Sequence, residues 1–361
     1  QADADLEAGV RLVSGLGFVR CSVGLRRGNL RLSDWPRRWP GSTGRWWRKH
    51  LTSGLSGCSD GALPSNVGRM QIGIDGVLVG HRTDEQAKTG CTVVRLPEGT
   101  VGSGEIRGGA PASREFALLD PTRSVQRLDA VVLSGGSAYG LAAGDGVMQA
   151  LEAEGVGFEL KDAIVPIVVG LSLFDLAIGD STVRPDAAWG LDALIAASSD
   201  PATGPVGAGT GATVGKWRGR EAVRRGGLGI HRVEQGALVV TAIVAVNAVG
   251  DIDDGSTAAR VLGGDRVWPE LDETDGLGDP NTVIGVVVTN AALDKVGCFL
   301  VAQGAHDGLA RAVFPPHMRT DGDGFVAAAT GDVDATVDEV RLAAVVATET
   351  AIRGAVAILP G

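Results

Sequence analysis

Runs of apolar residues alternate with polar, turn-forming stretches from Met70 onward, and they predict strands and helices in turn. Short β-branched runs are typical of buried strands. They fall at 71–80, 91–96, 129–134, 164–174, 237–248, 283–290 and 324–330. Longer segments with apolar residues three and four apart predict helices at about 138–154, 186–198, 294–312 and 334–358. This mixture is typical of an α/β protein whose sheets are covered by helices.

The stretch before the predicted strand 283–290 is rich in residues that form tight turns, Gly276, Gly278, Asp279, Pro280 and Asn281. It ends a region, 251–281, in which no element is predicted. Irregular connections of that length are uncommon unless they are functional or cleaved. Thr282 stands at the junction, where a self-cleaving hydrolase would expose a new N-terminal threonine.

The composition allows a substantial core and excludes several classes of protein. The chain has 361 residues with 55 Gly and 4% aromatic residues, which suits close packing of strands and helices. No apolar run reaches the roughly 18 residues of a membrane helix, and the acidic N-terminus does not have the pattern of a secretory signal. The four cysteines and five histidines show no metal-ligand spacing. We therefore expect a cytoplasmic protein with reduced thiols, no membrane partner and no metal.

Residues 1–69 differ from the rest of the chain in charge. They hold 11 Lys and Arg against 5 Asp and Glu, in a chain whose net charge is −10, and they contain four of its seven Trp. A basic, Trp-containing arm could bind nucleic acid or an anionic surface. Because the segment lacks sustained periodicity, we interpret it as a leader outside the catalytic fold and expect no nucleic-acid partner. Met70 is then a plausible start, and 70–361 is a single catalytic domain.

A glycine-rich motif, Ser134–Gly140, follows the predicted strand 129–134 and leads into the predicted helix 138–154. Small residues there let the backbone approach a ligand, and the amino end of a helix favours developing negative charge. The alternative is tight strand-to-helix packing with no ligand. Tyr139, the single tyrosine of the chain, favours a site, because its phenol can donate a hydrogen bond to an oxyanion.

A second glycine-rich segment, 207–216, matches neither of two phosphate-binding patterns. A phosphate loop needs Gly at the position of Thr210 and Ser or Thr at that of Trp217. A dinucleotide site needs a strand directly before the glycines, and the residues there, 200–205, do not have the pattern of a strand. A close-packed glycine loop is the simpler interpretation, with Lys216 as a candidate for a charge near a site.

Three polar residues beside predicted strands are further candidates. Asn247 ends the strand 237–248, where its amide either caps the strand or points a donor into a site. Asp321 and Asp323 flank a glycine before the strand 324–330, a pattern that by itself is typical of a solvated turn and lacks the further ligands of a calcium loop. Beside a nucleophile, the same pair could accept a hydroxyl proton and hold an ammonium group.

Taken together, residues 72–361 resemble the family of self-processing aminopeptidases and amidases that includes L-aminopeptidase/D-esterase, the β-peptidyl aminopeptidases and the nylon-oligomer hydrolase. The resemblance rests on Arg107-Gly-Gly-Ala-Pro111, Leu133–Ala143, Arg184-Pro-Asp186, Gly207–Lys216, Val246–Gly250, Asn281-Thr282, Ala305–Arg311 and Asp321-Gly-Asp323. It implies an α/β fold in the form of a four-layer αββα sandwich. It also implies scission between Asn281 and Thr282 into an α segment, 70–281, and a β segment, 282–361, and homo-oligomers of the processed units.

The family pattern implies a role for each candidate residue. Thr282 is implied to be the nucleophile, and Tyr139 and Asn247 fall where the family places the groups that stabilise the oxyanion. Lys216 lies where the members with a Thr nucleophile carry a lysine in the site. The resemblance implies a catalytic set of Thr282, Tyr139, Asn247, Lys216, Asp321 and Asp323.

Asp321 and Asp323 match the acidic pair of the nylon-oligomer hydrolase. The chain departs from the pattern at two neighbouring positions. Val283 follows the nucleophile, and Gly324 follows the acidic pair, where a Thr is expected in each case. These departures bear on positioning and rate more than on the class of reaction.

The resemblance predicts hydrolysis of amide bonds in small peptides or amino-acid amides, through an acyl-enzyme on Thr282 and without a metal or organic cofactor. An internal threonine is a weak nucleophile because no base adjoins its hydroxyl. Scission frees an α-amine whose pKa of roughly 7.7–8 lies near neutral pH, so the residue then carries its own base. Two alternatives stay open: an acyltransferase with the same nucleophile, and a non-catalytic small-molecule or nucleotide binder that uses the glycine loops.

Overall fold

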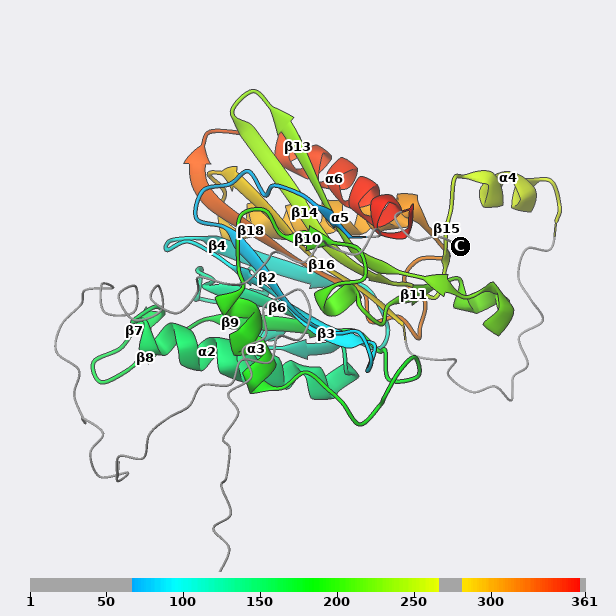
Figure 1. Cartoon of the computed structure of the whole chain (residues 1–361). Coiled ribbons are helices and arrows are strands. Elements are labelled where there is room, and N and C mark those ends of the chain that lie inside the picture. Colours follow the sequence, from blue (N-terminus) through cyan, green and yellow to red (C-terminus); the bar gives the residue numbers. More distant parts are fainter. Residues whose placement is uncertain (1–66, 266–280, 358–361) are drawn as a thin grey trace, which may run out of the picture. The chain divides into compact units, whose positions relative to one another are not determined.

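The computed structural model describes residues 67–265 and 281–357 (Figure 1). All described residues belong to one compact unit, Ser65–Gly361. The interpretation of 1–69 as a leader falls almost wholly outside the described residues. Of the turn-rich stretch before Thr282, the described part is Asn281.

Two five-stranded sheets form the centre of the described unit. Sheet I has the order β13 (Gly227–Gln235), β14 (Leu238–Asn247), β16 (Thr282–Ala291), β18 (Gly324–Val333) and β4 (Val101–Ile106). Sheet II has the order β2 (Leu78–Asp84), β3 (Thr89–Arg95), β6 (Ala130–Ser134), β9 (Val168–Ser172) and β5 (Ala112–Arg114). Neighbouring strands run antiparallel except for one parallel pair in each sheet, β16 with β18 and β6 with β9.

Short two-stranded ladders connect the outer segments. They are β1 (Gly68–Arg69) with β10 (Ala202–Thr203), β7 (Phe158–Glu159) with β8 (Ile164–Val165), β11 (Thr213–Val214) with β12 (Arg224–Arg225), and β15 (Asp251–Ile252) with β17 (Val313–Phe314). Each is antiparallel.

Five α-helices are described, α2 (Ala143–Ala153), α3 (Ala187–Ile195), α4 (Ser256–Leu262), α5 (Lys295–Ala312) and α6 (Val337–Ala357). In α3, α5 and α6 a side chain satisfies one of the first free backbone N–H groups. Asp294 accepts from the Gly297 N–H at 2.7 Å and so caps α5. Before α6, the Thr336 hydroxyl and the Glu339 carboxylate exchange hydrogen bonds with each other's backbone N–H, which forms a capping box.

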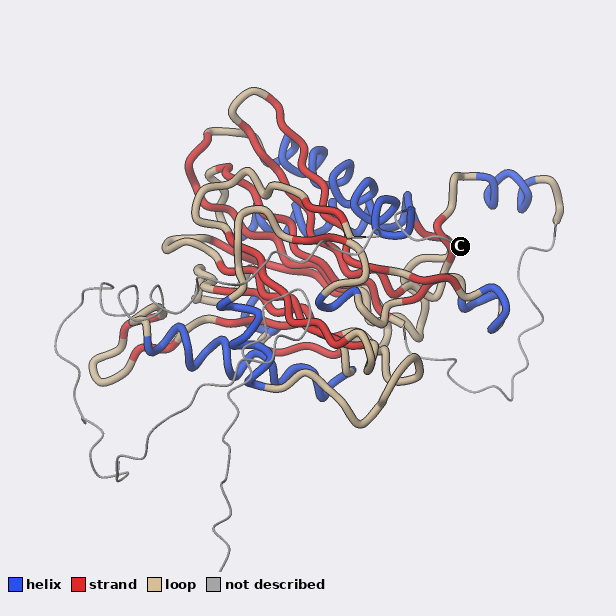
Figure 2. The backbone as a smooth tube through the Cα atoms, viewed as in Figure 1, coloured by secondary structure: helices blue, strands red, loops and turns tan. Residues whose placement is uncertain are grey.

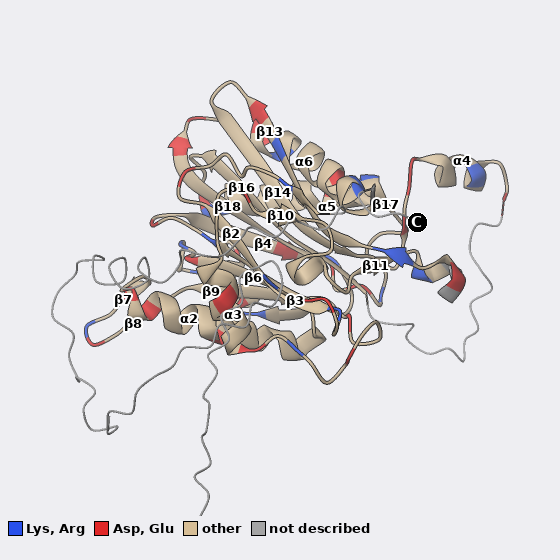
Figure 3. Ribbon diagram, in the orientation of Figure 1, with Lys and Arg blue, Asp and Glu red and all other residues tan. Residues whose placement is uncertain are grey.

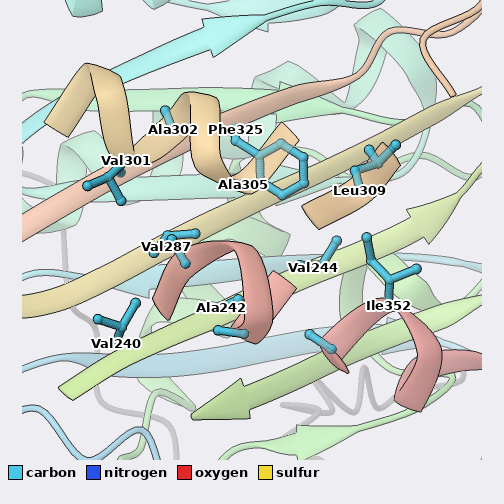
Figure 4. Close-up of a cluster of buried hydrophobic side chains, with 14 of the residues drawn as sticks. Val240, Ala242, Val244, Val287, Val301, Ala302, Ala305, Leu309, Phe325 and Ile352 are labelled. Atoms are coloured by element: carbon cyan, nitrogen blue, oxygen red, sulfur yellow. The ribbon is translucent and has the colours of Figure 1, made fainter. Parts of the chain in front are cut away.

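Three apolar clusters bury the faces of the two sheets. The first lies between α5 and α6 and one face of sheet I, where Val287 and Phe325 meet Leu309 and Ile352 (Figure 4). The second joins the other face of sheet I to sheet II, and the third packs α2 and α3 on sheet II. In Figure 1 and Figure 2, α6 and α2 accordingly lie on opposite outer sides of the strands. Burying one large apolar side chain contributes roughly 1.5–3 kcal/mol, so these clusters stabilise the fold.

The strongest sequence patterns give the right elements, and the weaker ones give errors. Strands predicted at 237–248, 283–290 and 324–330 are β14, β16 and β18, and the four predicted helices are α2, α3, α5 and α6. The prediction for 71–80 is wrong over most of its length, because β2 begins at Leu78. The predicted strand 164–174 is broken between β8 and β9, at the position of Pro166, which has no N–H to donate to a ladder.

Besides short strands of two or three residues, the sequence patterns missed three longer elements, β4, β13 and α4. β4 contains two glycines, and six of the nine residues of β13 are polar or glycine, so neither has an apolar run. The stretch 251–281 was predicted to be irregular, yet it contains α4.

Charged residues are absent from β14 and β16, which appear uncoloured in Figure 3. Such strands are typical of the centre of a sheet that is covered on both faces. Within residues 67–265 and 281–357, no helix combines the length and the apolar character needed to cross a membrane.

Candidate active site

Thr282 is the first residue of β16, in the middle of sheet I. It lies opposite Asn247, the last residue of β14, and its side chain is 4% exposed. Its hydroxyl donates a hydrogen bond to the carbonyl oxygen of Asn281. Asn281 in turn forms a parallel bridge with Asp321, and the Gly322 N–H donates to its carbonyl at 2.8 Å. The register of the sheet therefore places Asn247, the 281–282 peptide bond and the acidic pair side by side.

The acidic pair lies at the same end of the sheet because β16 and β18 are parallel, with Gly324 opposite Ile284, so the residues just before β18 lie beside the start of β16. Both carboxylates are buried, Asp321 to 2% exposure and Asp323 to 1%. Asp321 accepts hydrogen bonds from the Met318 N–H at 2.8 Å and the Val249 N–H at 3.4 Å. Asp323 accepts from the N–H of Val283, the residue after the candidate nucleophile, at 2.8 Å. The solvated turn that the pattern alone suggested is wrong.

The burial of the pair changes its chemistry. Loss of hydration and the neighbouring charge of Asp323 raise the pKa of Asp321 to about 7, against the opposing effect of its backbone donors and of Lys216. A carboxyl group in that range can take up and release a proton near neutral pH, as general acid–base catalysis requires.

Lys216 and Asn247 form a hydrogen-bonded unit beside Thr282. The Lys216 ammonium donates to the Asn247 side-chain oxygen at 2.7 Å and to the Thr213 carbonyl at 2.9 Å. The Asn247 amide nitrogen donates to the carbonyl of Phe174 at 2.9 Å. Since an amide nitrogen carries two protons, one N–H of Asn247 serves Phe174 and the other can serve a further acceptor.

Glycines explain how a second segment approaches the acidic pair. A Cβ at Gly108 would lie 2.3 Å from the Asp323 nitrogen, and one at Gly109 would lie 2.5 Å from the Arg319 carbonyl oxygen. A Cβ at Gly322 would lie 2.9 Å from the Thr282 hydroxyl oxygen and 2.7 Å from the carbonyl oxygen of Ala110. Contacts of this length require the absence of a side chain. The Arg107-Gly-Gly-Ala-Pro111 motif is therefore part of the wall around Thr282.

Tyr139 lies apart from this cluster. It belongs to a 3-10 turn, Ser137–Ala142, its side chain is 60% exposed, and the Arg184 guanidinium lies 3.7 Å from the centre of its ring. Among the described residues, no hydrogen bond joins Tyr139 to Thr282 or Asn247. The turn is nonetheless anchored next to the cluster, because the Ser137 N–H donates to the carbonyl of Leu173, whose neighbour Phe174 holds Asn247.

Two side chains of this region had no signal in the sequence. His317 donates to the Asp323 carboxylate from its backbone N–H at 3.2 Å and from its ring at 2.9 Å. Asp175 is buried and accepts from the N–H of Gly136, in the motif that carries Tyr139, at 2.7 Å. Burial raises the pKa of Asp175. Neither residue stands in a recognisable motif, so their contacts appear only in the fold.

No group of three or more His, Cys, Asp or Glu side chains within the described residues has the arrangement of a metal site. The cluster itself offers the buried hydroxyl of Thr282, two carboxylates, the amide of Asn247 and the ammonium group of Lys216.

Solved structures similar to this chain define the class of fold. An L-aminopeptidase D-Ala-esterase/amidase from Ochrobactrum anthropi, described as a new variant among the Ntn hydrolase fold, has a TM-score of 0.61 at 20% identity, covering 83% of this chain and 88% of that one. A Burkholderia sp. β-aminopeptidase has a TM-score of 0.60 at 22% identity, covering 79% and 85%. The chain thus has a mixed α/β fold of the Ntn hydrolase class.

The chain belongs to the Peptidase family S58, whose family model matches residues 72–358. An uncharacterized aminopeptidase of Mycobacterium leprae is 42% identical over 292 residues, covering 73% of this chain and 79% of that protein. A 6-aminohexanoate-oligomer endohydrolase of Agromyces sp. is 30% identical over 287 residues, covering 74% and 78%. The resemblance that the sequence motifs indicated is confirmed.

Proposed function

We propose that this chain is a self-cleaving hydrolase of amide bonds that acts through an acyl-enzyme on Thr282. The observation that carries the proposal is the buried contact between the Thr282 hydroxyl and the carbonyl of Asn281, with two buried carboxylates in the adjoining loop. A hydroxyl held against one particular carbonyl has the proximity that an intramolecular attack needs. Membership of a peptidase family supports the same class of reaction.

In the first step the Thr282 oxygen attacks the carbonyl carbon of Asn281, and the peptide nitrogen leaves as the amine of Thr282. The chain is then joined through an ester between Asn281 and the Thr282 oxygen. Water hydrolyses this ester, which gives the Asn281 carboxylate and restores the hydroxyl. We assign to Asp321 the acceptance of the hydroxyl proton, and its pKa of about 7 supports this role because it matches a base that works near neutral pH.

In later cycles the same hydroxyl attacks a substrate amide, with the new α-amine as its base. Asn247 donates to the oxyanion through the N–H that Phe174 does not use, and Lys216 holds the Asn247 oxygen so that the nitrogen faces the site. Asp321 and Asp323 hold the ammonium form of the new amine. Tyr139 would join as a second donor when its turn brings the phenol to a bound substrate.

The proposal extends to the organisation of the chain. The three apolar clusters, which join α5 and α6 to sheet I, sheet I to sheet II, and sheet II to α2 and α3, support a four-layer αββα sandwich. We assign residues 70–361 to one catalytic domain, and small peptides or amino-acid amides as substrates. The names of the relatives, aminopeptidase, β-aminopeptidase and 6-aminohexanoate-oligomer endohydrolase, support this substrate class.

The test is the mass of the purified chain and of its Thr282→Ala variant. The wild-type chain should give two fragments that meet at Asn281/Thr282 and separate only on denaturation. The variant should remain one chain and be inactive on amide substrates. Active wild-type protein that is not cleaved would rule out this mechanism.

A further inference from the structure

His317 lies behind the acidic pair, on the side of Asp323 away from Val283. Its backbone N–H and its ring Nδ1 both lie within hydrogen-bond distance of one carboxylate oxygen, Oδ2, at 3.2 and 2.9 Å. The other oxygen, Oδ1, accepts from the N–H of Val283 at 2.8 Å. Since an ionised carboxylate can only accept, the ring Nδ1 carries the proton in this contact. A chain of hydrogen bonds thus runs from the imidazole through Asp323 to the residue next to Thr282.

The imidazole is itself held in place from its other side. The ring of His306 packs edge-on against it at 5.0 Å between centroids, and His306 is fixed by a hydrogen bond to the Glu105 carbonyl at 2.9 Å. Burial lowers the pKa of His306 to about 3, so this neighbour adds no charge at neutral pH. The Nε2 atom of His317 is buried without a hydrogen-bond partner among the described residues.

The backbone at His317 has a conformation that is uncommon for a residue with a side chain. Its φ is 53°, in the left-handed region that a residue with a Cβ rarely adopts. This conformation aims the N–H and the ring of the same residue at one oxygen. A residue in such a conformation persists when the surrounding contacts determine it, and such residues cluster at functional sites.

We propose that His317 is a positioning residue for the self-cleavage site, which fixes the Asp323 carboxylate and, through it, the start of β16 at Thr282. The inference rests on the proposed function, since it assumes that Thr282 is the nucleophile. In this role the imidazole acts through Asp323, which it contacts, and not directly on the reacting atoms. It restricts Asp323 to the one rotamer in which Oδ1 can hold the Val283 N–H, and so it aligns the Thr282 hydroxyl with the Asn281 carbonyl.

Self-cleavage is the right readout because it is intramolecular and has no substrate-binding step. The full-length chain is made by cell-free translation, and the uncleaved fraction is followed by intact mass over time. His317→Gly removes the ring and relieves the backbone strain, while His317→Asn keeps an N–H donor on a residue that tolerates the left-handed region. Glu115→Gly is the matched control, because Glu115 is an exposed residue with the same φ of 53°.

We expect His317→Gly to slow self-cleavage by about 10- to 100-fold, as small displacements of reacting groups do. His317→Asn should recover most of that loss, and Glu115→Gly should cleave at the wild-type rate. If His317 only stabilised the fold, His317→Gly and His317→Asn, once thermal unfolding shows both to be folded, would cleave themselves at equal rates. The inference is overturned if His317→Gly cleaves at the wild-type rate, or if the folded Gly and Asn variants are slowed equally. Cleavage of Thr282→Ala would instead overturn the proposed function itself.

Discussion

Adding one methyl group at Gly322 should obstruct the candidate nucleophile. The new Cβ would lie 2.9 Å from the Thr282 hydroxyl oxygen, 2.7 Å from the Ala110 carbonyl oxygen and 3.1 Å from the Pro111 Cα. Carbon–oxygen contacts in proteins are ordinarily about 3.3–3.6 Å, so the surrounding atoms must move by roughly 0.5 Å. Overpacking of this kind costs about 1–3 kcal/mol of stability. A displacement of about 1 Å costs roughly 100-fold in rate, so we expect Gly322→Ala to slow self-cleavage by about 10- to 100-fold.

The assay compares the uncleaved fraction over time, by intact mass, with the unfolding midpoint of the same sample. Gly354→Ala is the matched control, because Gly354 lies in α6 and a Cβ there meets no atom within 4 Å. That variant should cleave at the wild-type rate and gain up to about 1 kcal/mol from the better helix propensity of alanine. Cleavage of folded Gly322→Ala at the wild-type rate would refute the placement of the nucleophile beside Gly322.

Three further predictions concern buried titratable groups. Because the pKa of Asp321 is about 7, self-cleavage should speed up as pH rises through 7. Asp321→Asn should cleave about 100-fold more slowly and without this pH dependence, and an unchanged pH profile would contradict a role of Asp321 as a base. Burial raises the pKa of Asp175, so the folded state favours its neutral form and wild-type stability falls as pH rises. The unfolding midpoint of Asp175→Asn, relative to that of wild type, should therefore increase from pH 4 to pH 7, and a difference that does not change with pH would contradict this. The pKa of His306 is lowered to about 3, so the neutral ring contributes its full stability above pH 6.5, and this is lost as pH falls, by up to about 1.4 kcal/mol per pH unit. In urea unfolding, the stability of His306→Asn should therefore fall less steeply with decreasing pH than that of wild type, and an equal fall would contradict the prediction.

The sequence predicted the strands of the site well because the centre of a sheet has a simple physical pattern. β14 and β16 are buried on both faces, so they appear as continuous apolar runs, and Asn247 and Thr282 mark their ends. β4 could not be predicted in this way. It is the edge strand beyond β18, and its glycines are explained by close neighbours in the fold, such as the Leu128 side chain against Gly102.

The acidic pair shows what local pattern can and cannot reveal. Asp321-Gly-Asp323 has the composition of a solvated turn, and nothing within a few residues indicates that both carboxylates are buried. Their burial depends on the parallel pairing of β16 with β18 and on the segment that ends at Pro111, which is distant in sequence. His317 was missed for the same reason, because the turn that brings its ring to Asp323 is formed by the fold and has no sequence motif. The resemblance to a family supplied the roles of Asp321 and Asp323, whereas periodicity did not.

The position of Thr282 within sheet I determines what scission can do to the protein. β16 is hydrogen-bonded along its length to β14, from Asn247 opposite Thr282 to Val240 opposite Thr289, and on its other side to β18. Cutting the bond before Thr282 would therefore remove one covalent link at the end of the β14–β16 ladder and would leave the pairing of β16 with β14 and with β18 in place. The neighbouring strands β14, on the amino-terminal side of the cut, and β16, on its carboxy-terminal side, would then belong to different polypeptides that share one core. Scission at this bond can thus create a new amine beside Asp321 while the sheet that aligns it stays assembled.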